Sequence, residues 1–400
     1  MNIEKISYYL LLVVVITLPL FAKLTPITIV IFSILTIVNG FKNKSFNIEN
    51  KKVFYFGLSF FLIHLISVFY SEHKDVAWFD IEVKLSLFVF PLLFIVKNRY
   101  LSRSNILFLF SMATFIALVY MLTMAMNNYS ELGYKSFEYT NLSRYMHPTY
   151  ISMYTLFSLV YLLNLFLENY GRNAKYYLLL LPIIIFIISI YLFQSKAGYI
   201  SFFLVLLYFT IKYIFNSKNI IIKILLPLVI ILFSVLSYFN SYRVRDMIGV
   251  VNQIVLTGDS RNTTTGIRFE IWKATCKIIP DNFVFGVGAG DIKPELNVKY
   301  NENAEFLSLA KKENLNVHNQ YLETFLGQGV IGFLLLIFLL VFGALQAFKV
   351  KDSVFISFMI LIIVNFFPES MLNTQSGVVF FSVFFYLLSG TEYKKYSLNI

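Results

Sequence analysis

Residues 220–239 read "IIIKILLPLVIILFSVLSYF", a run of apolar residues interrupted by a single charge, Lys223. A helix of about 20 residues spans the hydrocarbon core of a bilayer and satisfies its own backbone hydrogen-bonding groups there. Similar runs recur along the chain, so 58% of the 400 residues are hydrophobic and only 14% are charged. Soluble domains have roughly half apolar and a quarter charged residues. The sequence therefore predicts an all-α polytopic membrane protein.

The apolar runs predict about twelve transmembrane helices. The fourth run and the last two are short. The first follows Lys5 without a small-residue cleavage site, so it is expected to be a signal anchor rather than a cleaved signal. No internal repeat indicates a duplicated transporter. The predicted spans are 7–22, 24–40, 53–70, 84–96, 105–126, 148–168, 176–193, 197–215, 220–239, 328–348, 353–368 and 374–389.

Lys and Arg residues predict the orientation of these spans. If the N-terminus is cytoplasmic, seventeen of the 33 basic residues fall in inner segments and only six in the short outer ones. Short loops rich in Lys and Arg stay in the cytoplasm, so both termini are expected there. The inner set is Lys5, Lys42, Lys44, Lys51, Lys52, Lys97, Arg99, Arg103, Arg172, Lys175, Lys212, Lys218, Lys223, Lys349, Lys351, Lys394 and Lys395; the outer set is Lys23, Lys74, Lys84, Lys135, Arg144 and Lys196.

The remaining basic residues lie in one long segment on the outer side. The chain is thus predicted to divide into transmembrane helices 1–9 (1–239), a large loop (240–327), and transmembrane helices 10–12 with a cytoplasmic tail (328–400). Long loops in compact folds are usually functional or disordered. This loop contains aromatic residues and amphipathic helix-like stretches, so we expect it to be folded. A second outer segment covers 127–147, and the chemistry is expected on this side.

Arg268 stands out in the loop sequence "TGIRFEIWKATCKIIP", residues 265–280. On a helix, Ile271, Trp272, Thr275 and Ile279 fall within about 60° of Arg268. The opposite face carries the other charges: Glu270, Lys273 and Lys277. An arginine on an apolar face often reaches toward lipid headgroups. The alternative is a buried cation held for an anionic ligand, because an unpaired buried charge is costly.

His318 opens the stretch "NVHNQYLETFLGQGVIG", residues 316–332. As part of a helix it would share a face with Leu322 and Phe325, and Asn316 would cap that helix. A histidine on an apolar face is more often a structural residue than a catalyst. At the outer membrane boundary, however, it is well suited to accept a proton near neutral pH.

Three more candidates lie at outer ends of predicted spans. Lys196, in "FQSKAGYI", occupies a short turn between two apolar runs. Ionisable residues at membrane depth indicate function, although a lysine at a helix end can also reach the headgroups. Arg144 and His147, in "RYMHPTY", precede Pro148, which suits the first turn of a helix. His147 could simply be the polar residue that starts it.

The glycine-rich stretch "GVGAGD", residues 286–291, matches neither nucleotide-binding pattern. We expect a tight turn there, with Gly288 bringing backbone amides near a ligand. The histidines show no zinc-site spacing and the outer loops contain no Asp-x-Asp motif. No metal and no cofactor is expected.

In their order and context these motifs resemble those of the O-antigen ligase/polymerase superfamily of bacterial envelope glycosyltransferases. The motifs are "QSKAG", "RFEIW", "FGVGAG" and "HNQYLETFLGQGVIG", within about residues 140–332. Twelve spans with a large loop after the ninth resemble the ligase branch. The family's histidine then falls on His318, its loop arginine on Arg268, and the basic residue of its short turn on Lys196. Many members have arginine there, and lysine cannot grip a phosphate with two hydrogen bonds.

The resemblance implies transfer of a glycan from undecaprenyl diphosphate to an acceptor hydroxyl at the periplasmic face of the inner membrane. The acceptor would be the lipid A–core of lipopolysaccharide. Arg268 and Lys196, with Arg144, would bind the diphosphate, and His318 would be the base. His147, Asn319 and Gly288 would support substrate binding. Transfer would be inverting and metal-independent.

Other functions remain open at this point. An O-antigen polymerase and a protein O-oligosaccharyltransferase need the same donor and differ in the acceptor. A polyprenyl-glycan transporter is a different class, for which charges at the bilayer midplane and repeat symmetry are typical. Here the unusual charges gather at the outer edge, which favours the enzyme. The net charge of +11 is explained by topology and does not indicate a nucleic-acid partner.

Overall fold

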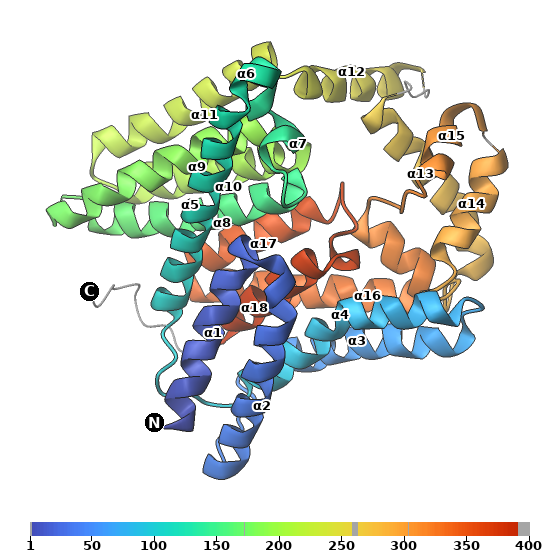
Figure 1. Ribbon diagram of the computed structural model, residues 1–400, viewed down its shortest axis with the longest axis horizontal. Helices are drawn as coiled ribbons and strands as arrows, with labels where there is room; N and C mark the ends of the chain where they lie inside the picture. Colours follow the sequence, from blue (N-terminus) through green and yellow to red (C-terminus); the bar gives the residue numbers. More distant parts are fainter. Residues whose placement is uncertain (1, 172, 258–262, 303, 391–400) are drawn as a thin grey trace.

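The computed structural model describes residues 2–171, 173–257, 263–302 and 304–390, and helices dominate it (Figure 1). Arg172, Lys394 and Lys395, which contribute to the predicted orientation, lie outside the described residues, as does the rest of the predicted tail after residue 390. The α-helices are α1 Ile3–Leu20, α2 Thr25–Asn43, α3 Lys51–Tyr70, α4 Lys74–Phe94, α5 Arg103–Asn127, α6 Tyr129–Leu132, α7 Tyr139–Leu142, α8 Pro148–Asn169, α9 Leu180–Phe193, α10 Lys196–Asn216, α11 Ile220–Asn240, α12 Tyr242–Thr257, α13 Thr264–Ile278, α14 Ile292–Glu302, α15 Ala304–Lys312, α16 Gln320–Val350, α17 Ser353–Asn365 and α18 Gln375–Ser389.

Nine of the helical segments described are long and apolar enough to cross a bilayer, and they coincide with nine of the twelve predicted spans. The prediction of an all-α, multi-pass membrane protein is therefore confirmed. The number twelve stays a prediction. The nine segments are Ile3–Leu20, Ala22–Asn43, Lys51–Tyr70, Arg103–Asn127, Pro148–Asn169, Ala174–Phe193, Lys196–Asn216, Ile220–Asn240 and Gln320–Val350.

The three remaining predicted spans differ from a simple membrane helix. Helix α4 begins at Lys74, ten residues before the predicted fourth span, and carries a buried ion pair in its middle: Lys84 is only 2% exposed and is paired with Asp80. Helices α17 and α18 have 13 and 15 residues, fewer than the roughly 20 that a span needs. Most of their side chains are buried against other helices.

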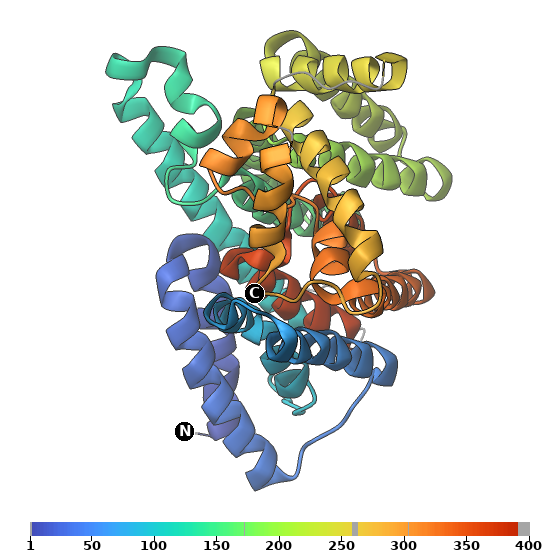
Figure 2. The same ribbon diagram turned by 90° about the vertical axis from the view of Figure 1, so that its right-hand side faces the viewer.

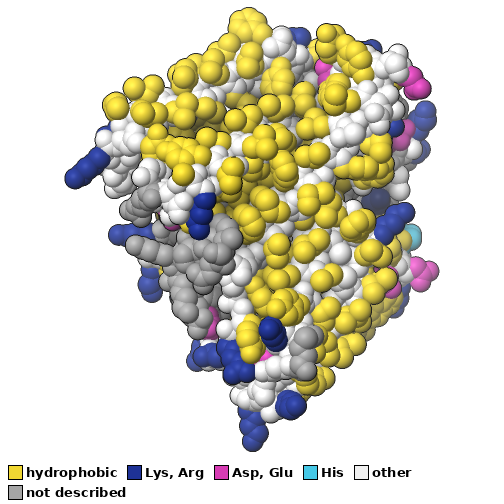
Figure 3. Space-filling model, turned by 60° about the vertical axis from the view of Figure 1, so that its left-hand side comes forward, with side chains coloured by type: hydrophobic (Ala, Val, Ile, Leu, Met, Phe, Trp, Pro, Cys, Tyr) yellow, Lys and Arg dark blue, Asp and Glu magenta, His cyan; other side chains and the backbone are white. Residues whose placement is uncertain are grey.

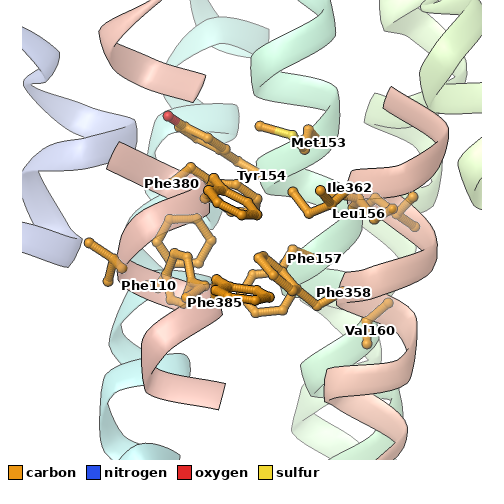
Figure 4. Packing of buried hydrophobic residues seen from close by; sticks show 14 of the residues in the cluster. Phe110, Met153, Tyr154, Leu156, Phe157, Val160, Phe358, Ile362, Phe380 and Phe385 are labelled. Atoms are coloured by element: carbon orange, nitrogen blue, oxygen red, sulfur yellow. The ribbon is translucent and has the colours of Figure 1, made fainter. Parts of the chain in front are cut away.

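The centre of the bundle is built around α8, in which every residue from Pro148 to Leu167 is buried. Aromatic rings from α5, α8, α17 and α18 interlock there (Figure 4). The ring centroid of Phe157 lies 6.0 Å from that of Phe110 and 5.4 Å from that of Phe358. Offset and edge-to-face aromatic pairs stabilise a core beyond their buried area. Helix α8 is therefore held rigidly in the bundle, and it fixes the position of the residues that precede it.

Large apolar side chains also cover the outside of the bundle. Ile27, Ile34 and Leu345 are each more than half exposed, and Figure 3 shows a broad belt of hydrophobic side chains with Lys and Arg at its edges. A surface of this kind is unusual for a soluble monomer and suits a lipid environment.

Residues 127–147, 241–257, 263–302 and 304–319 lie on the same face of the molecule, which we call the loop face (Figure 2). Helices α13, α14 and α15 cover the middle of it (Figure 2). They share a small hydrophobic core with the start of α16, formed by side chains such as Ile271, Leu296, Leu307 and Leu326. The described residues between α12 and α16 therefore form packed helices that rest on the beginning of α16. That this segment is one large periplasmic loop stays a prediction.

Helix α16 is broken at Gly329, whose φ of 63° and ψ of −165° are not helical. A side chain at this position would collide with the backbone of Val284 and Phe285. Val330 donates a hydrogen bond to the carbonyl of Phe283 (2.8 Å). The break lets the 283–288 loop pass directly against α16, and it falls close to the predicted boundary between loop and tenth span.

Candidate active site on the loop face

Glu369 lies at the centre of a charged cluster, in the segment between α17 and the short helix η5 (Met371–Asn373). Arg268 Nη2 is 2.8 Å from one carboxylate oxygen, and His318 Nδ1 is 3.4 Å from the other. The Glu369 side chain is only 10% exposed. One buried acid thus brings together an arginine and a histidine that the sequence analysis singled out separately.

Arg268 reaches Glu369 because α13 is docked on the end of α17. The Trp272 indole donates to the carbonyl of Val317 (3.0 Å), and its ring centroid lies 5.0 Å from that of Phe367. Arg268 Nη1 donates to the carbonyl of Pro368 (2.8 Å). A guanidinium has five N–H donors, so Arg268 keeps donors for a further anion. Its side chain is 25% exposed.

The predicted apolar face of α13 agrees with the structure at three positions: Ile271, Thr275 and Ile279 are buried. Glu270, expected on the opposite, solvent-facing side, is instead only 9% exposed and pairs with Lys273 (3.0 Å). The loop helices cover both sides of α13, so its helical periodicity alone could not reveal that burial.

His318 was expected on a helix, and that expectation is wrong. Helix α16 begins at Gln320, and His318 precedes it with a positive φ of 51°. The helix cap is Asn319 rather than Asn316: its side chain accepts a hydrogen bond from Leu322 N (3.1 Å), while Asn316 Oδ1 accepts one from His318 N (3.0 Å). This left-handed turn aims the imidazole at Glu369 instead of along the helix. Such strain in a non-glycine residue is frequent at functional sites.

Asn319 holds the turn in place. It is only 3% exposed, and its backbone N–H donates to Ser370 Oγ (3.2 Å), next to Glu369. Glu323, one helical turn further, accepts hydrogen bonds from Ser370 Oγ (2.9 Å) and from Val317 N (3.1 Å). These buried polar bonds fix the His318 and Glu369 segments to each other.

His147 lies at the edge of the same cluster. It precedes α8, and its Nδ1 accepts a weak hydrogen bond from Thr149 N (3.4 Å). Although His147 is an exposed residue, the protein around its ring desolvates it and lowers its pKa below the usual value, with Arg268 and His318 adding to the effect and Glu369 opposing it. Thr149 Oγ1 in turn donates to Glu369 (3.5 Å). The structure thus brings His147 close to Arg268 and His318.

Glu369 stays ionised at every physiological pH. Burial opposes its charge, but Arg268 and the hydrogen bond and charge of His318 outweigh burial and lower the pKa from 4.5 to about 2.

A carboxylate with a depressed pKa, such as Glu369, stabilises the fold above its unfolded pKa and loses that effect as the pH falls through the folded one. Compared with Glu369→Gln, we expect the wild-type stability advantage to be constant from pH 8 to about 5 and to vanish as the pH falls from 4.5 toward 2. Thermal unfolding in detergent across this pH range measures it; an advantage lost near pH 7 would contradict the assignment.

Lys196 is placed beside this cluster, but its donors are occupied. It is the first residue of α10, and its ammonium group binds Asp246 (3.0 Å), Thr264 (3.3 Å) and Thr265 at the first turn of α13. Arg268 follows Thr265 by one turn, and its charge acts on Lys196. Lys196 therefore ties α10 to α12 and α13 and adds positive charge next to Arg268.

Arg243 is a cation that the sequence analysis did not select. Its Nε donates to the carbonyl of Gln194 (3.1 Å), and its guanidinium lies 3.8 Å from the centre of the Tyr139 ring. Its charge acts on both Lys196 and His147. The available signal was its position as the second residue of the amphipathic α12, three residues after the end of α11, in the arginine-rich "YRVRD" (242–246).

Arg144 is not brought into this cluster. It is exposed, and within the described residues it makes no hydrogen bond or ion pair. Gly288 is not there either. Its φ is 99°, its N–H donates to the carbonyl of Gly327 (3.0 Å), and a side chain would collide with Ser71. The N–H of Val287 and that of Gly290 also bind protein groups, Leu326 O (2.8 Å) and Ser71 Oγ (3.2 Å). The glycine turn therefore packs the loop against α16 and α3.

A second buried ion pair is connected by hydrogen bonds to Glu323, which holds the His318 and Glu369 segments together. Lys84 pairs with Asp80 and donates to Asn373 Oδ1 (3.2 Å), and Asn373 donates to Glu323 (2.7 Å).

Removing one partner of a buried pair leaves an uncompensated charge. We expect Lys84→Met to lower the free energy of unfolding by about 3–5 kcal/mol, measured by thermal or denaturant unfolding in detergent. Lys74→Met, an exposed residue of the same helix, is the matched control; equal stability of both variants would contradict this role.

Sequence reasoning missed Glu369 because it follows a predicted span and no local motif marks it. The available signal was a single acidic residue next to Pro368, in "FFPESMLN" (366–373), at an end of an apolar run. Its partners lie 101 and 51 residues away in the chain, so only the fold identifies the carboxylate as their common neighbour.

Comparison with known proteins agrees with the motifs. An uncharacterized protein of Haemophilus influenzae (strain ATCC 51907 / DSM 11121 / KW20 / Rd) is 26% identical over 309 residues, which cover 75% of this chain and 73% of that protein. Residues 181–337 match the family described as O-antigen ligase. This range includes Lys196, Arg268 and His318 and excludes His147 and Glu369. The resemblance inferred from the sequence is thereby confirmed over residues 181–337, which match the O-antigen ligase family.

Proposed function

We propose that this protein is a membrane glycosyltransferase of the O-antigen ligase type. It transfers a glycan from undecaprenyl diphosphate to an acceptor hydroxyl, with the lipid A–core of lipopolysaccharide as the acceptor. In this proposal the chain lies in the inner membrane of a bacterium with both termini in the cytoplasm, and the loop face is periplasmic. The observation that carries the proposal is Glu369 bound between Arg268 and His318.

The arrangement supplies a base for the acceptor. Because His318 Nδ1 faces Glu369 (3.4 Å), Nε2 is the ring nitrogen left for a substrate. A carboxylate on one nitrogen fixes the orientation of an imidazole and stabilises the imidazolium that forms when the other nitrogen takes a proton, as in catalytic triads. His318 is the catalytic residue in this proposal, and Glu369 is a positioning residue.

The cations stabilise the negative charge that develops on the leaving group. Arg268 keeps free N–H donors and Arg243 presents its guanidinium over Tyr139. Lys196, paired with Asp246, would contribute by exchanging that partner for a diphosphate oxygen. Donors placed where negative charge develops lower the barrier to reaction. A diphosphate monoester whose charge is matched is a stable leaving group, so the reaction needs no strong general acid and no metal ion.

The reaction is then a single displacement. The acceptor hydroxyl oxygen attacks the anomeric carbon from the side opposite the diphosphate, and His318 Nε2 takes the hydroxyl proton. The bond between the anomeric carbon and the diphosphate oxygen breaks, and its electron pair leaves with the lipid diphosphate. The configuration at the anomeric carbon is inverted. The polyprenyl chain stays in the lipid, along apolar surfaces between the helices.

A transfer assay tests the proposal. The full chain in lipid nanodiscs is incubated with lipid-linked oligosaccharide, EDTA, and either lipid A–core, a second lipid-linked oligosaccharide, or unglycosylated protein. We expect product on lipid A–core. Product only on the second lipid-linked oligosaccharide would replace the ligase by a polymerase, and product only on protein would make it a protein O-oligosaccharyltransferase. Movement of the intact donor across a vesicle membrane without transfer would overturn the proposal in favour of a transporter.

A further inference from the structure

An open pocket of about 520 Å³ lies on the loop face, in segment 127–147 and the helix ends that this segment covers. It is formed where α5 and α9 end and the segment with α6 and η2 (Gly133–Phe137) folds over them. Three aromatic rings make most of its wall, and the centroid of the Tyr129 ring is 5.5 Å from that of Tyr134 and 6.3 Å from that of Phe137. The lining residues are Met126, Tyr129, Tyr134, Phe137, Glu138 and Leu192.

Two of the residues that line this pocket are close in the chain to residues that contact Arg243. Glu138 is followed by Tyr139, whose ring lies under the Arg243 guanidinium (3.8 Å). Leu192 is two residues before Gln194, whose carbonyl accepts the Arg243 Nε–H (3.1 Å). His147 also faces Tyr139, with ring centroids 6.5 Å apart. A molecule in the pocket is therefore a neighbour of a group bound by the cations.

The lining is mostly apolar and aromatic and includes one carboxylate, a combination that suits a sugar ring. The apolar face of a pyranose ring packs on aromatic rings, and its hydroxyls need hydrogen-bond partners at the rim. Glu138 is exposed and makes no hydrogen bond through its side chain to another described residue, and Tyr129 and Tyr134 contribute phenolic hydroxyls. A lipid chain in the pocket would desolvate this carboxylate without compensation. The aromatic residues also lie beyond Asn127, where α5 ends.

We propose that this pocket binds a sugar ring of the glycan, stacked on Tyr134 and Tyr129 with Glu138 accepting hydroxyl hydrogen bonds. The proposal rests on the glycosyltransferase function proposed above and extends it with a glycan subsite next to the diphosphate. The sugar belongs either to the lipid-linked donor or to the acceptor glycan, and the chemistry of recognition is the same for both.

Binding and kinetics together test the subsite. Tyr134 is 80% exposed, so Tyr134→Ala leaves the fold intact, and Tyr134→Phe is the matched control that keeps the ring. In nanodiscs, we compare the dissociation constants of lipid-linked oligosaccharide extracted from the source cells and of bare undecaprenyl diphosphate. The KM values for donor and acceptor are measured in the transfer assay. Stacking on one aromatic ring gives a difference of roughly three- to tenfold.

If the donor sugar is bound, Tyr134→Ala weakens the binding of lipid-linked oligosaccharide by that factor and raises only the donor KM. The binding of bare undecaprenyl diphosphate is unchanged. If the acceptor sugar is bound, only the acceptor KM rises. In both cases Tyr134→Phe behaves as wild type. Equal weakening of both lipids would show a hydrocarbon pocket and overturn the proposal, as would the absence of any change. A wild type that binds lipid-linked oligosaccharide without transferring it would instead refute the proposed function; the effect of Tyr134→Ala on binding of lipid-linked oligosaccharide, and on binding of the free acceptor glycan, would then decide the subsite.

Discussion

His318→Ala is expected to lower the rate of glycan transfer by about 10²- to 10⁴-fold, the usual contribution of a positioned general base. The imidazole is held by Glu369 through Nδ1 (3.4 Å), so its loss removes the proton acceptor and leaves the cations in place. Binding of bare undecaprenyl diphosphate should therefore stay within about twofold of wild type, a difference of less than 1 kcal/mol. Initial transfer rates and lipid binding in nanodiscs measure the two effects.

His73→Ala is the matched control for His318. His73 is also a histidine on the loop face paired with a carboxylate, Asp291 (2.6 Å), but its side chain is 52% exposed and it contacts none of the proposed site residues. We expect transfer close to wild type. If a well-folded His318→Ala enzyme transferred glycan as fast as this control, His318 would be a structural residue, and His147 would become the candidate base.

Arg268→Ala should abolish transfer and also destabilise the protein. The substitution leaves Glu369, only 10% exposed, without its main counter-charge. Breaking a buried ion pair in this way costs about 3–5 kcal/mol. The same substitution removes an N–H donor set from the proposed diphosphate site, so affinity for undecaprenyl diphosphate should fall as well. Thermal unfolding and lipid binding follow the two consequences separately.

A double variant separates the structural role of Arg268 from its chemical one. Arg268→Met combined with Glu369→Met replaces both charges by apolar side chains, which often recovers the stability lost in the single variant. We expect recovered stability with no recovered transfer. Arg144→Ala, an exposed arginine outside the cluster, should change neither property. Transfer by the stable double variant at the wild-type rate would show that the pair is only structural.

The sequence was informative wherever the deciding interaction is local. The nine long spans follow from unbroken apolar runs, and the face of α13 that includes Arg268 follows from helical periodicity. Pro148 at the first position of α8 was likewise predicted by its restricted backbone. In each case the residues within one element are sufficient to determine the pattern.

The site itself depends on contacts between distant segments. Lys84 counts in the sequence only as one of the outer basic residues, because nothing in its neighbourhood shows that α4 buries it against Asn373, 289 residues later. His318 was placed on a helix, since the cap at Asn319 is held by Ser370 from another element. Such buried polar partners are invisible to periodicity.

The most direct test of the central claim is a structure of the full chain in nanodiscs with undecaprenyl diphosphate bound. We expect the diphosphate on the loop face, with its oxygens within hydrogen-bonding distance of Arg268 and its charge next to Arg243. His318 Nε2 should face the space where the first sugar is attached. A diphosphate bound at the opposite face of the bundle, or on the loop face away from Arg268 and His318, would contradict the assignment of Arg268, Glu369 and His318 as one active site.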